Sequence, residues 1–389
     1  MEIVPAKRVT SVKPYFFAKL QKTIEKLKKK GMDIIRLDIG SPDLPPASFI
    51  IEALVDTARK PDMHGYGEPG GSNSLRNAMA AYYQKRFDVC VDPNDEVLSL
   101  IGSKEGIYNL SQVLLDPGDM TLLPDPCYPV YPIGPTITNS KPYYMPLLAE
   151  NNFLPQFSNI PENVLSKAKL MWLNYPNNPT GAIAPLAFFQ EAVDIAQKYN
   201  ILIAHDAPYL DVSFDDYQAP SLLQIPGAKE VAIEFNSLSK TYNMAGWRVG
   251  MAIGNPKVIR LLRVLKSQID SSQFKPIMKA AEAALLGDQT WVVERNLIYQ
   301  QRRDIVINTI QGLGFRVQKP KAALYVWAKI PARWQDSLEY CDAVLYATGV
   351  SMTPGTVYGK SGAGYIRISL VTPAKRLEEA MHRLRKFHD

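Results

Sequence analysis

NSLSKTYNMAGWRVG, residues 236–250, is the stretch around which the rest of the chain is organised. Its lysine, Lys240, has no acidic residue beside it, and the lack of a carboxylate partner favours the unprotonated amine that attacks carbonyl carbons. Ser237 and Arg248 offer a hydroxyl and a guanidinium, which suit an anion with several oxygens, most simply a phosphate. A reactive lysine beside a phosphate clamp predicts a site for pyridoxal 5′-phosphate. The alternative is a surface lysine in a polar loop.

The composition is that of an ordinary globular protein. With 389 residues, of which 46% are hydrophobic and 21% charged, the chain is long enough for two domains. Much of its net charge of +6 comes from the run Lys19–Lys30, which predicts the solvated face of a helix rather than a nucleic-acid surface. We therefore expect no nucleic-acid partner.

The cysteines, the histidines and the N-terminus bear on the compartment and on metal binding. Three widely spaced cysteines predict no disulfide framework, and four histidines without a ligand motif predict no metal site. The N-terminus lacks an apolar leader, and no run of 18 apolar residues occurs, so we expect neither secretion nor a membrane span. These features predict a cytoplasmic protein.

Strands and helices alternate along most of the chain. The predicted strands cover 34–39, 97–101, 120–123, 169–174, 201–204, 231–235 and 249–253, and the predicted helices cover 15–30, 47–60, 75–87, 107–115 and 185–199. This order predicts an α/β domain with a mostly parallel sheet. One long helical segment, about 256–311, is expected to leave that domain.

The C-terminal part of the chain predicts a smaller α+β domain. Its expected strands lie near 323–329 and 364–370, and its expected helices near 337–347 and 373–388. We place the large domain at 43–295 and the small domain at 1–42 and 296–389.

Polar side chains recur where predicted strands end, which is the edge at which open α/β sheets bind ligands. Ser103 and Lys104 follow the strand at 97–101, in a strand–turn–helix order that presents amide groups to a phosphate. The ring of Tyr128 can stack on a flat ligand, or it can fill space in a proline-rich loop. The glycine-rich loop at 66–76 is either a phosphate loop or a tight turn.

Three further polar positions stand out. Asn178 precedes a proline, so its backbone is extended and its amide projects from the loop. Asp206 directly follows a buried strand and is either a turn residue or a functional carboxylate. In the strand 365–370, alternation places Arg367 on the polar face, where its partner is either an internal carboxylate or the carboxylate of a substrate.

These positions together resemble class I aminotransferases of fold type I along nearly the whole chain. The matching motifs are Asn-Pro-Thr-Gly at 178–181, Asp-x-x-Tyr at 206–209, Ser-x-Ser-Lys at 237–240, Gly-x-Arg-x-Gly at 246–250 and the arginine at 367. The resemblance implies a mostly parallel seven-stranded sheet beside a smaller α+β domain. It also implies ping-pong transfer of an amino group between an amino acid and a 2-oxo acid through pyridoxal phosphate.

The resemblance implies a role for each matching residue. Lys240 would bond covalently to the cofactor's aldehyde, Asp206 would pair with the pyridinium nitrogen, and Arg367 would bind the substrate carboxylate. Asn178 and Tyr209 would bond the 3′ oxygen, and Tyr128 would stack on the ring. The residues expected around the phosphate are Ser103, Lys104, Ser237, Ser239 and Arg248. Tyr66 would reach the phosphate in a neighbouring subunit, which implies a homodimer.

Within the family, the segments 14–20, 40–45 and 102–106 look most like the LL-diaminopimelate aminotransferase branch. That branch implies 2-oxoglutarate as acceptor and implies that Tyr15, Gly40 and Asn178 contact substrate. Residues 266–274 depart from the expected Asp-Ser-Gly-x-Phe, with Ser272 in place of glycine, in a loop expected near the substrate. An alanine- or aspartate-type aminotransferase and a β-eliminating C–S lyase on the same fold stay open.

Overall fold

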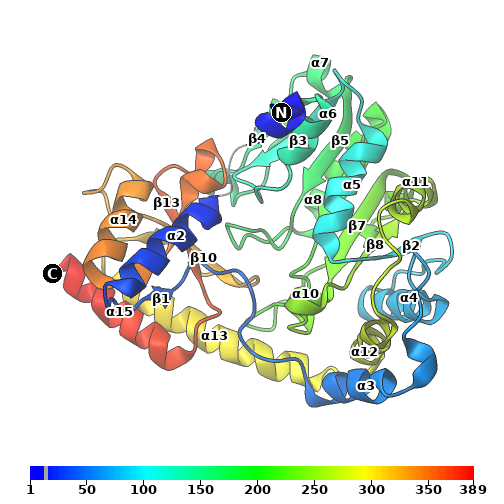
Figure 1. The fold of residues 1–389 in the computed structure, drawn as a ribbon. Coiled ribbons are helices and arrows are strands. Elements are labelled where there is room, and N and C mark those ends of the chain that lie inside the picture. Colours follow the sequence, from blue (N-terminus) through cyan, green and yellow to red (C-terminus); the bar gives the residue numbers. More distant parts are fainter. Residues whose placement is uncertain (13–15) are drawn as a thin grey trace.

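The computed structural model describes residues 1–12 and 16–389 of the chain. Its largest sheet has seven strands in the spatial order β2-β8-β7-β6-β5-β3-β4 (Figure 1). Only β8 runs antiparallel to its neighbours, so the predicted mostly parallel sheet is confirmed. The strands are β2 (Val97–Leu100), β3 (Met120–Asp125), β4 (Lys141–Pro146), β5 (Ala168–Leu173), β6 (Leu202–Asp206), β7 (Ala232–Ser237) and β8 (Gly250–Gly254).

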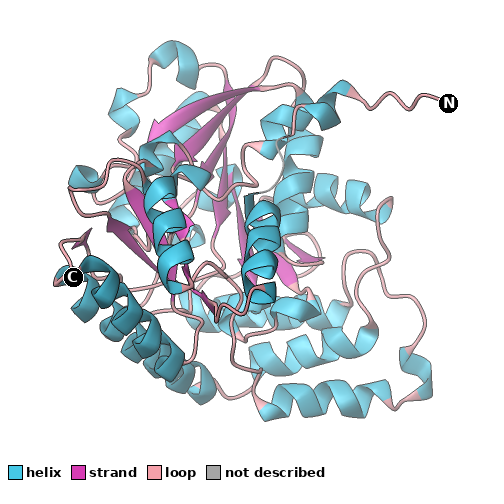
Figure 2. Cartoon of the chain, turned by 60° about the vertical axis from the view of Figure 1, so that its left-hand side comes forward, coloured by secondary structure: helices cyan, strands magenta, loops and turns pink. Residues whose placement is uncertain are grey.

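Helices cover both faces of this sheet, as Figure 2 shows. Along β5, Leu170 and Trp172 pack into one hydrophobic cluster, while Met171 and Leu173 pack into another. This division follows from the alternation of side chains along a strand, and it explains why the strands are apolar at almost every position. The helices of this region are α3 (Ser48–Ala58), α4 (Asn73–Phe87), α5 (Ser103–Leu114), α6 (Ile133–Thr138), α7 (Glu162–Leu165), α8 (Leu186–Tyr199), α9 (Ala228–Val231), α10 (Leu238–Thr241), α11 (Pro256–Ser267) and α12 (Lys275–Leu286).

The C-terminal part forms a second layer with its own hydrophobic cluster. Its antiparallel sheet has the order β12-β13-β10-β9, and β1 pairs in parallel with β11 beside it. These strands are β1 (Ile35–Arg36), β9 (Arg316–Val317), β10 (Tyr325–Lys329), β11 (Val350–Ser351), β12 (Thr353–Pro354) and β13 (Tyr365–Ser369). The helices are α2 (Phe16–Lys29), α13 (Thr290–Gln311), α14 (Ser337–Thr348) and α15 (Ala374–His388), and α1 (Lys7–Thr10) lies at the N-terminus. The domain boundaries at 42/43 and 295/296 stay a prediction.

Three local predictions are wrong. The expected helix over 256–311 is three helices, because Ser272 has a left-handed backbone (φ +70°) between α11 and α12, and Gly287 ends α12. The helix α5 begins at Ser103, four residues before the expected start at Ile107. The prediction started too late because the first turn of this helix is polar and shows no apolar periodicity. The strand expected at 34–39 has only two residues.

Among the residues that the structure describes, no helix combines the length and the apolar character needed to cross a membrane.

Candidate active site

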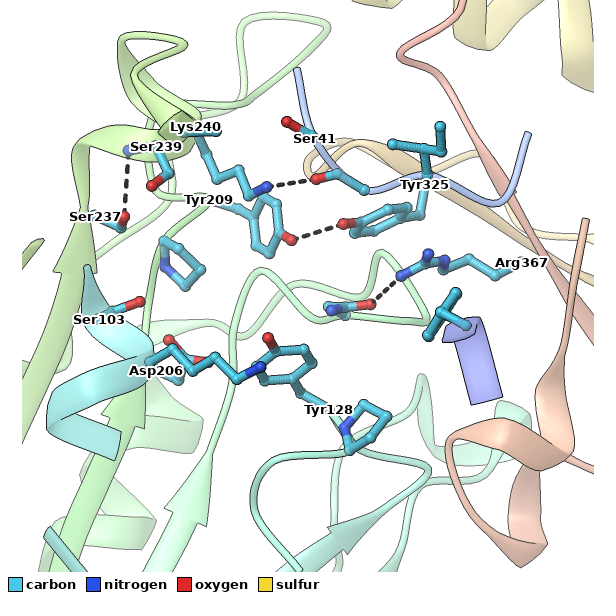
Figure 3. Close-up of a pocket in the computed structure, with 18 of the residues that line it drawn as sticks. Ser41, Ser103, Tyr128, Asp206, Tyr209, Ser237, Ser239, Lys240, Tyr325 and Arg367 are labelled. Carbon is cyan, nitrogen blue, oxygen red and sulfur yellow. Dashed lines mark hydrogen bonds between the residues drawn. The ribbon is translucent and has the colours of Figure 1, made fainter. Parts of the chain in front are cut away.

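A cavity of about 460 Å³ lies at the carboxyl ends of β6 and β7, and residues of β10 and β13 line it from the smaller sheet (Figure 3). Most of the predicted site residues line this one cavity: Gly40, Ser103, Lys104, Tyr128, Asn178, Asp206, Tyr209, Ser237, Ser239, Lys240, Arg248 and Arg367. Their individual roles stay predictions. Their convergence from segments far apart in the sequence defines the candidate site.

Lys240 enters the cavity from α10, a single helical turn that follows β7. Ser237 caps this turn, because its hydroxyl accepts a hydrogen bond from the Ser239 backbone N–H at 3.2 Å. The Lys240 Nζ donates to the carbonyl oxygen of Gly40 (Figure 3). Burial lowers the pKa of Lys240, and the positive charge of Arg367 lowers it further. The lysine is therefore not a surface residue, and its setting favours a neutral amine.

Asp206 is the last residue of β6, and its side chain is almost fully buried. The Tyr131 hydroxyl donates to Oδ2 at 2.6 Å, whereas Oδ1 is buried and receives no hydrogen bond from any residue that the structure describes. Burial raises the pKa of Asp206 to about 6, although the Tyr131 hydrogen bond opposes that shift. A buried carboxylate oxygen needs a donor. The protonated ring nitrogen of pyridoxal phosphate supplies one, so the site fits that cofactor.

Asn174, at the end of β5, fixes the loop that carries Asn178. Its Nδ2 donates to the Asp206 carbonyl at 2.6 Å, and its Oδ1 accepts from the Asn178 backbone N–H at 2.8 Å. One buried amide therefore joins the Asn178 loop to the neighbouring strand end. No motif in the sequence marks Asn174, because an asparagine after a strand is also an ordinary turn residue.

The predicted phosphate end forms where β2 passes into α5. Ser103 and Lys104 occupy the first turn of α5, where helix amide groups are unpaired and favour an anion. Gly102 before them has φ +74°, and a side chain there would overlap the Arg248 guanidinium, so only glycine lets Arg248 lie against this turn. Burial lowers the pKa of Lys104, and the Arg248 charge adds to that effect. The result is a compact group of donors and positive charge that suits a phosphate.

Arg367, on β13, forms the opposite end of the cavity. Its Nη1 donates to Asn178 Oδ1 at 3.0 Å, and its Nη2 donates to the Asp38 carbonyl oxygen at 2.9 Å. Its Nε is buried without a hydrogen-bond partner among the described residues, and none of their carboxylates forms an ion pair with it. The alternative of an internal salt bridge is therefore not supported in the described part of the chain. A guanidinium in this state suits the carboxylate of a substrate.

Aromatic rings surround Arg367, and the sequence analysis missed them. The guanidinium carbon lies 4.1 Å from the Tyr325 ring centre and 5.1 Å from that of Tyr358. The Tyr325 hydroxyl also bonds the Tyr209 hydroxyl at 2.9 Å, so Tyr325 links the arginine to the predicted cofactor residues (Figure 3). Both tyrosines lie beside ordinary apolar positions in the sequence, and no short motif marks them.

Two sequence predictions do not reach this cavity, and a third cannot be placed because it lies outside the described residues. Tyr66 lies in a surface loop with 91% of its area exposed and does not line the cavity. Tyr15 lies outside the described residues. The departing loop at 266–274, expected near the substrate, does not line the cavity in this chain; it packs behind the Arg248 backbone.

Comparisons with known proteins agree with this geometry. The family model for aminotransferase class I and II matches residues 32–384. The LL-diaminopimelate aminotransferase of Moorella thermoacetica is 48% identical over 98% of this chain and 97% of its own length. LL-diaminopimelate aminotransferase 2 of Nostoc sp. is 44% identical over 97% of both chains.

Solved structures give the same picture. The chain is similar to substrate-bound BacF from Bacillus subtilis, with a TM-score of 0.95 and 39% identity over 100% of this chain and 98% of that one. A single mutant of the Thermus thermophilus aspartate aminotransferase gives a TM-score of 0.93 at 25% identity, covering 99% of this chain and 100% of that one.

Proposed function

The chain belongs to the class I and II aminotransferases, a pyridoxal-phosphate-dependent family, and we propose that it transfers the amino group of LL-diaminopimelate to 2-oxoglutarate. The main support for this substrate is the 48% identity, over nearly the whole of both chains, to a protein named LL-diaminopimelate aminotransferase. Several other relatives with that name match over similar lengths, at 44% to 48% identity.

When bound, pyridoxal phosphate supplies an electron sink that stabilises negative charge on the α-carbon of the amino acid. Asp206 would bind the ring nitrogen through Oδ1, which has no hydrogen-bond partner among the described residues, and would thereby favour the protonated nitrogen. Lys240 would hold the cofactor and would then move the proton of the substrate α-carbon, a role that its lowered pKa favours. Arg367 would orient the substrate by its carboxylate, and Tyr209 and the Asn178 amide would bond the 3′ oxygen of the cofactor.

The substrate side of the cavity has polar groups beyond Arg367. Arg36 and Gln21 line it, and the Arg36 Nη1 donates to Gln21 Oε1 at 2.7 Å. Asp38 accepts two bonds of 2.7 Å from Arg36, and its side chain is 1% exposed, which fixes the guanidinium at the cavity wall. A substrate with a second amino-acid end, such as diaminopimelate, suits a polar wall of this kind.

We also propose that the enzyme is a cytoplasmic homodimer in which Tyr66 reaches the neighbouring active site. Tyr66 is exposed, and its loop packs against that of Phe274, whose half-exposed ring lies 5.7 Å from the His64 ring. Exposed aromatic residues of this kind suit an interface between copies. Cys90, Cys127 and Cys341 are free thiols, which suits a reducing compartment.

A donor and acceptor screen tests the substrate. We expect kcat/KM for LL-diaminopimelate with 2-oxoglutarate to exceed that for alanine or aspartate by about 100-fold. Meso-diaminopimelate is the matched control, because it has the same atoms with one centre inverted. Higher values for alanine or aspartate, or release of pyruvate and ammonia without an added oxo acid, would contradict the proposal.

Mixed dimers test the shared site. We expect Tyr66→Ala and Lys240→Ala subunits to be nearly inactive alone and to regain activity when mixed, because one site then has both residues. No recovery in verified hybrids would mean that Tyr66 does not serve the neighbour.

A further inference from the structure

The loop between α11 and α12 contacts the phosphate end from outside the cavity. It carries Gln273, which is buried but does not line the cavity. We propose that Gln273 is a positioning residue that holds the Arg248 backbone and the turn before α5 in the arrangement that binds the cofactor phosphate. This inference rests on the phosphate placement proposed above.

The side-chain amide of Gln273 joins two segments that carry phosphate residues. Its Nε2 donates to the Leu100 carbonyl at 2.6 Å and to the Arg248 carbonyl at 3.1 Å. Leu100 pairs with Gly250 at the end of the β2–β8 ladder. The amide therefore joins the two strands by hydrogen bonds just beyond their last backbone pair, where the chain separates toward Ser103 on one side and Arg248 on the other.

The orientation of this amide is fixed from its other side. Gln273 Oε1 accepts from the Ser272 hydroxyl at 2.9 Å and from the Ser99 hydroxyl at 3.5 Å. Both amide hydrogens and the carbonyl oxygen are thus engaged. Rotating the amide would place its oxygen against two carbonyl oxygens, so only one orientation satisfies the buried groups.

The last turn of α11, directly before this loop, contacts the same turn. Lys266 is 1% exposed, and its Nζ lies 3.2 Å from Glu105 Oε2 and 2.8 Å from Asp270 Oδ2. Glu105 Oε2 in turn accepts from the Ile101 N–H at 2.7 Å, one residue before Gly102. The last turn of α11 and the end of the loop therefore both support the segment 100–105, which presents Ser103 and Lys104 to the cavity.

Ser272 supports the Gln273 amide at the cost of an unusual backbone conformation. Its φ of +70° is a conformation that strains residues other than glycine, and glycine is the residue expected at this position. Serine is strained there but supplies the hydroxyl that bonds Gln273. Ser272→Gly would relieve the backbone and release one side of the Gln273 amide.

The test compares two aldehydes that differ only in the phosphate. Cofactor-free enzyme is titrated with pyridoxal phosphate and with pyridoxal, and each dissociation constant is taken from the absorbance of the bound aldehyde. We expect Gln273→Leu to raise the dissociation constant of pyridoxal phosphate about tenfold, because the Leu100 and Arg248 carbonyls lose a buried donor. We expect the dissociation constant of pyridoxal to change by less than about twofold. A purely structural role would weaken both alike.

Two other variants make the result decisive. Ser272→Gly should raise only the dissociation constant of pyridoxal phosphate, about threefold. It should not lower the midpoint of thermal unfolding, because glycine adopts this backbone conformation without strain. This variant decides the question if Gln273→Leu fails to fold. Gln268→Leu, exposed on the same loop, should change neither constant.

Arg248→Ala separates this inference from the phosphate placement. If Arg248→Ala weakens the binding of both aldehydes alike, the phosphate does not lie beside Arg248, and the inference about Gln273 fails with that placement. If Arg248→Ala is selective but Gln273→Leu and Ser272→Gly are not, only the role of Gln273 is overturned.

Discussion

The two ends of the cavity are built in different ways. At the phosphate end, Ser103 and Ser239 lie in turns that directly follow strands of the large sheet, and Arg248 lies just before its antiparallel strand. At the carboxylate end, Arg367 is held by Asn178 and Asp38, which lie far from it in the sequence. Both ends combine segments that are far apart in the sequence, but the first uses residues next to strands of one sheet, whereas the second joins residues from the two parts of the fold. Substitutions at the two ends should therefore change different measurements.

Lys240 lies between the two ends, and its loss should have the largest effect. We expect Lys240→Ala to lower kcat at least about 1,000-fold, because the proton-transfer group and the covalent attachment are both removed. The visible absorbance of the bound cofactor should also change, and borohydride should no longer attach a pyridoxyl label. Labelling of another lysine in the wild type would contradict the assignment.

Arg367→Ala should separate the carboxylate end from the phosphate end. We expect kcat/KM to fall about 100-fold for every amino acid, since all share the carboxylate and Asn178 loses its partner. The dissociation constant of pyridoxal phosphate should stay within about twofold of the wild type. Arg367→Lys is the matched control, because it keeps the charge but loses the planar pair of donors. A fall in kcat/KM confined to one substrate would contradict the role of Arg367 in binding the carboxylate that all substrates share.

Asp206 tests how far tertiary burial tunes a residue that the sequence identified. Burial raises its pKa from 3.8 to about 6, so the folded cofactor-free protein keeps a proton that the unfolded chain has lost. Its free energy of unfolding should therefore fall as pH rises through this interval, by up to about 3 kcal/mol. Asp206→Asn should remove that contribution. Urea unfolding of both cofactor-free proteins across the interval gives the difference, and parallel pH profiles would contradict it.

Tyr325→Phe should have the smallest effect. It removes the hydroxyl that bonds Tyr209 but keeps the ring against Arg367. We expect a loss of about 1 kcal/mol, seen as about a fivefold fall in kcat/KM, because one buried hydrogen bond is lost. Tyr358→Phe is the neighbouring control, since that hydroxyl does not bond Tyr209. A larger loss than for Arg367→Ala would mean that the ring pair, and not the guanidinium, organises this end.

The alternation of apolar strands and helices determined the class of fold, because a sheet buried on both faces requires apolar strands joined by helices. The motif around Lys240 identified the family, since covalent attachment and phosphate binding need fixed residue types at short spacing. Asp206, Asn178 and Arg367 were also predicted, because each lies in a motif or in a strand with clear alternation, and all three line the cavity.

Only the tertiary structure decided which groups hold those residues in place. Tyr131, Asn174 and Tyr325 reach the site across strands and domains, and no spacing along the chain encodes such contacts. The orphaned oxygen of Asp206 and the raised pKa of its carboxyl likewise arise from burial, which depends on every neighbouring element at once. Sequence patterns identify the groups that do chemistry, while packing decides their partners, because contact depends on distance in space rather than along the chain.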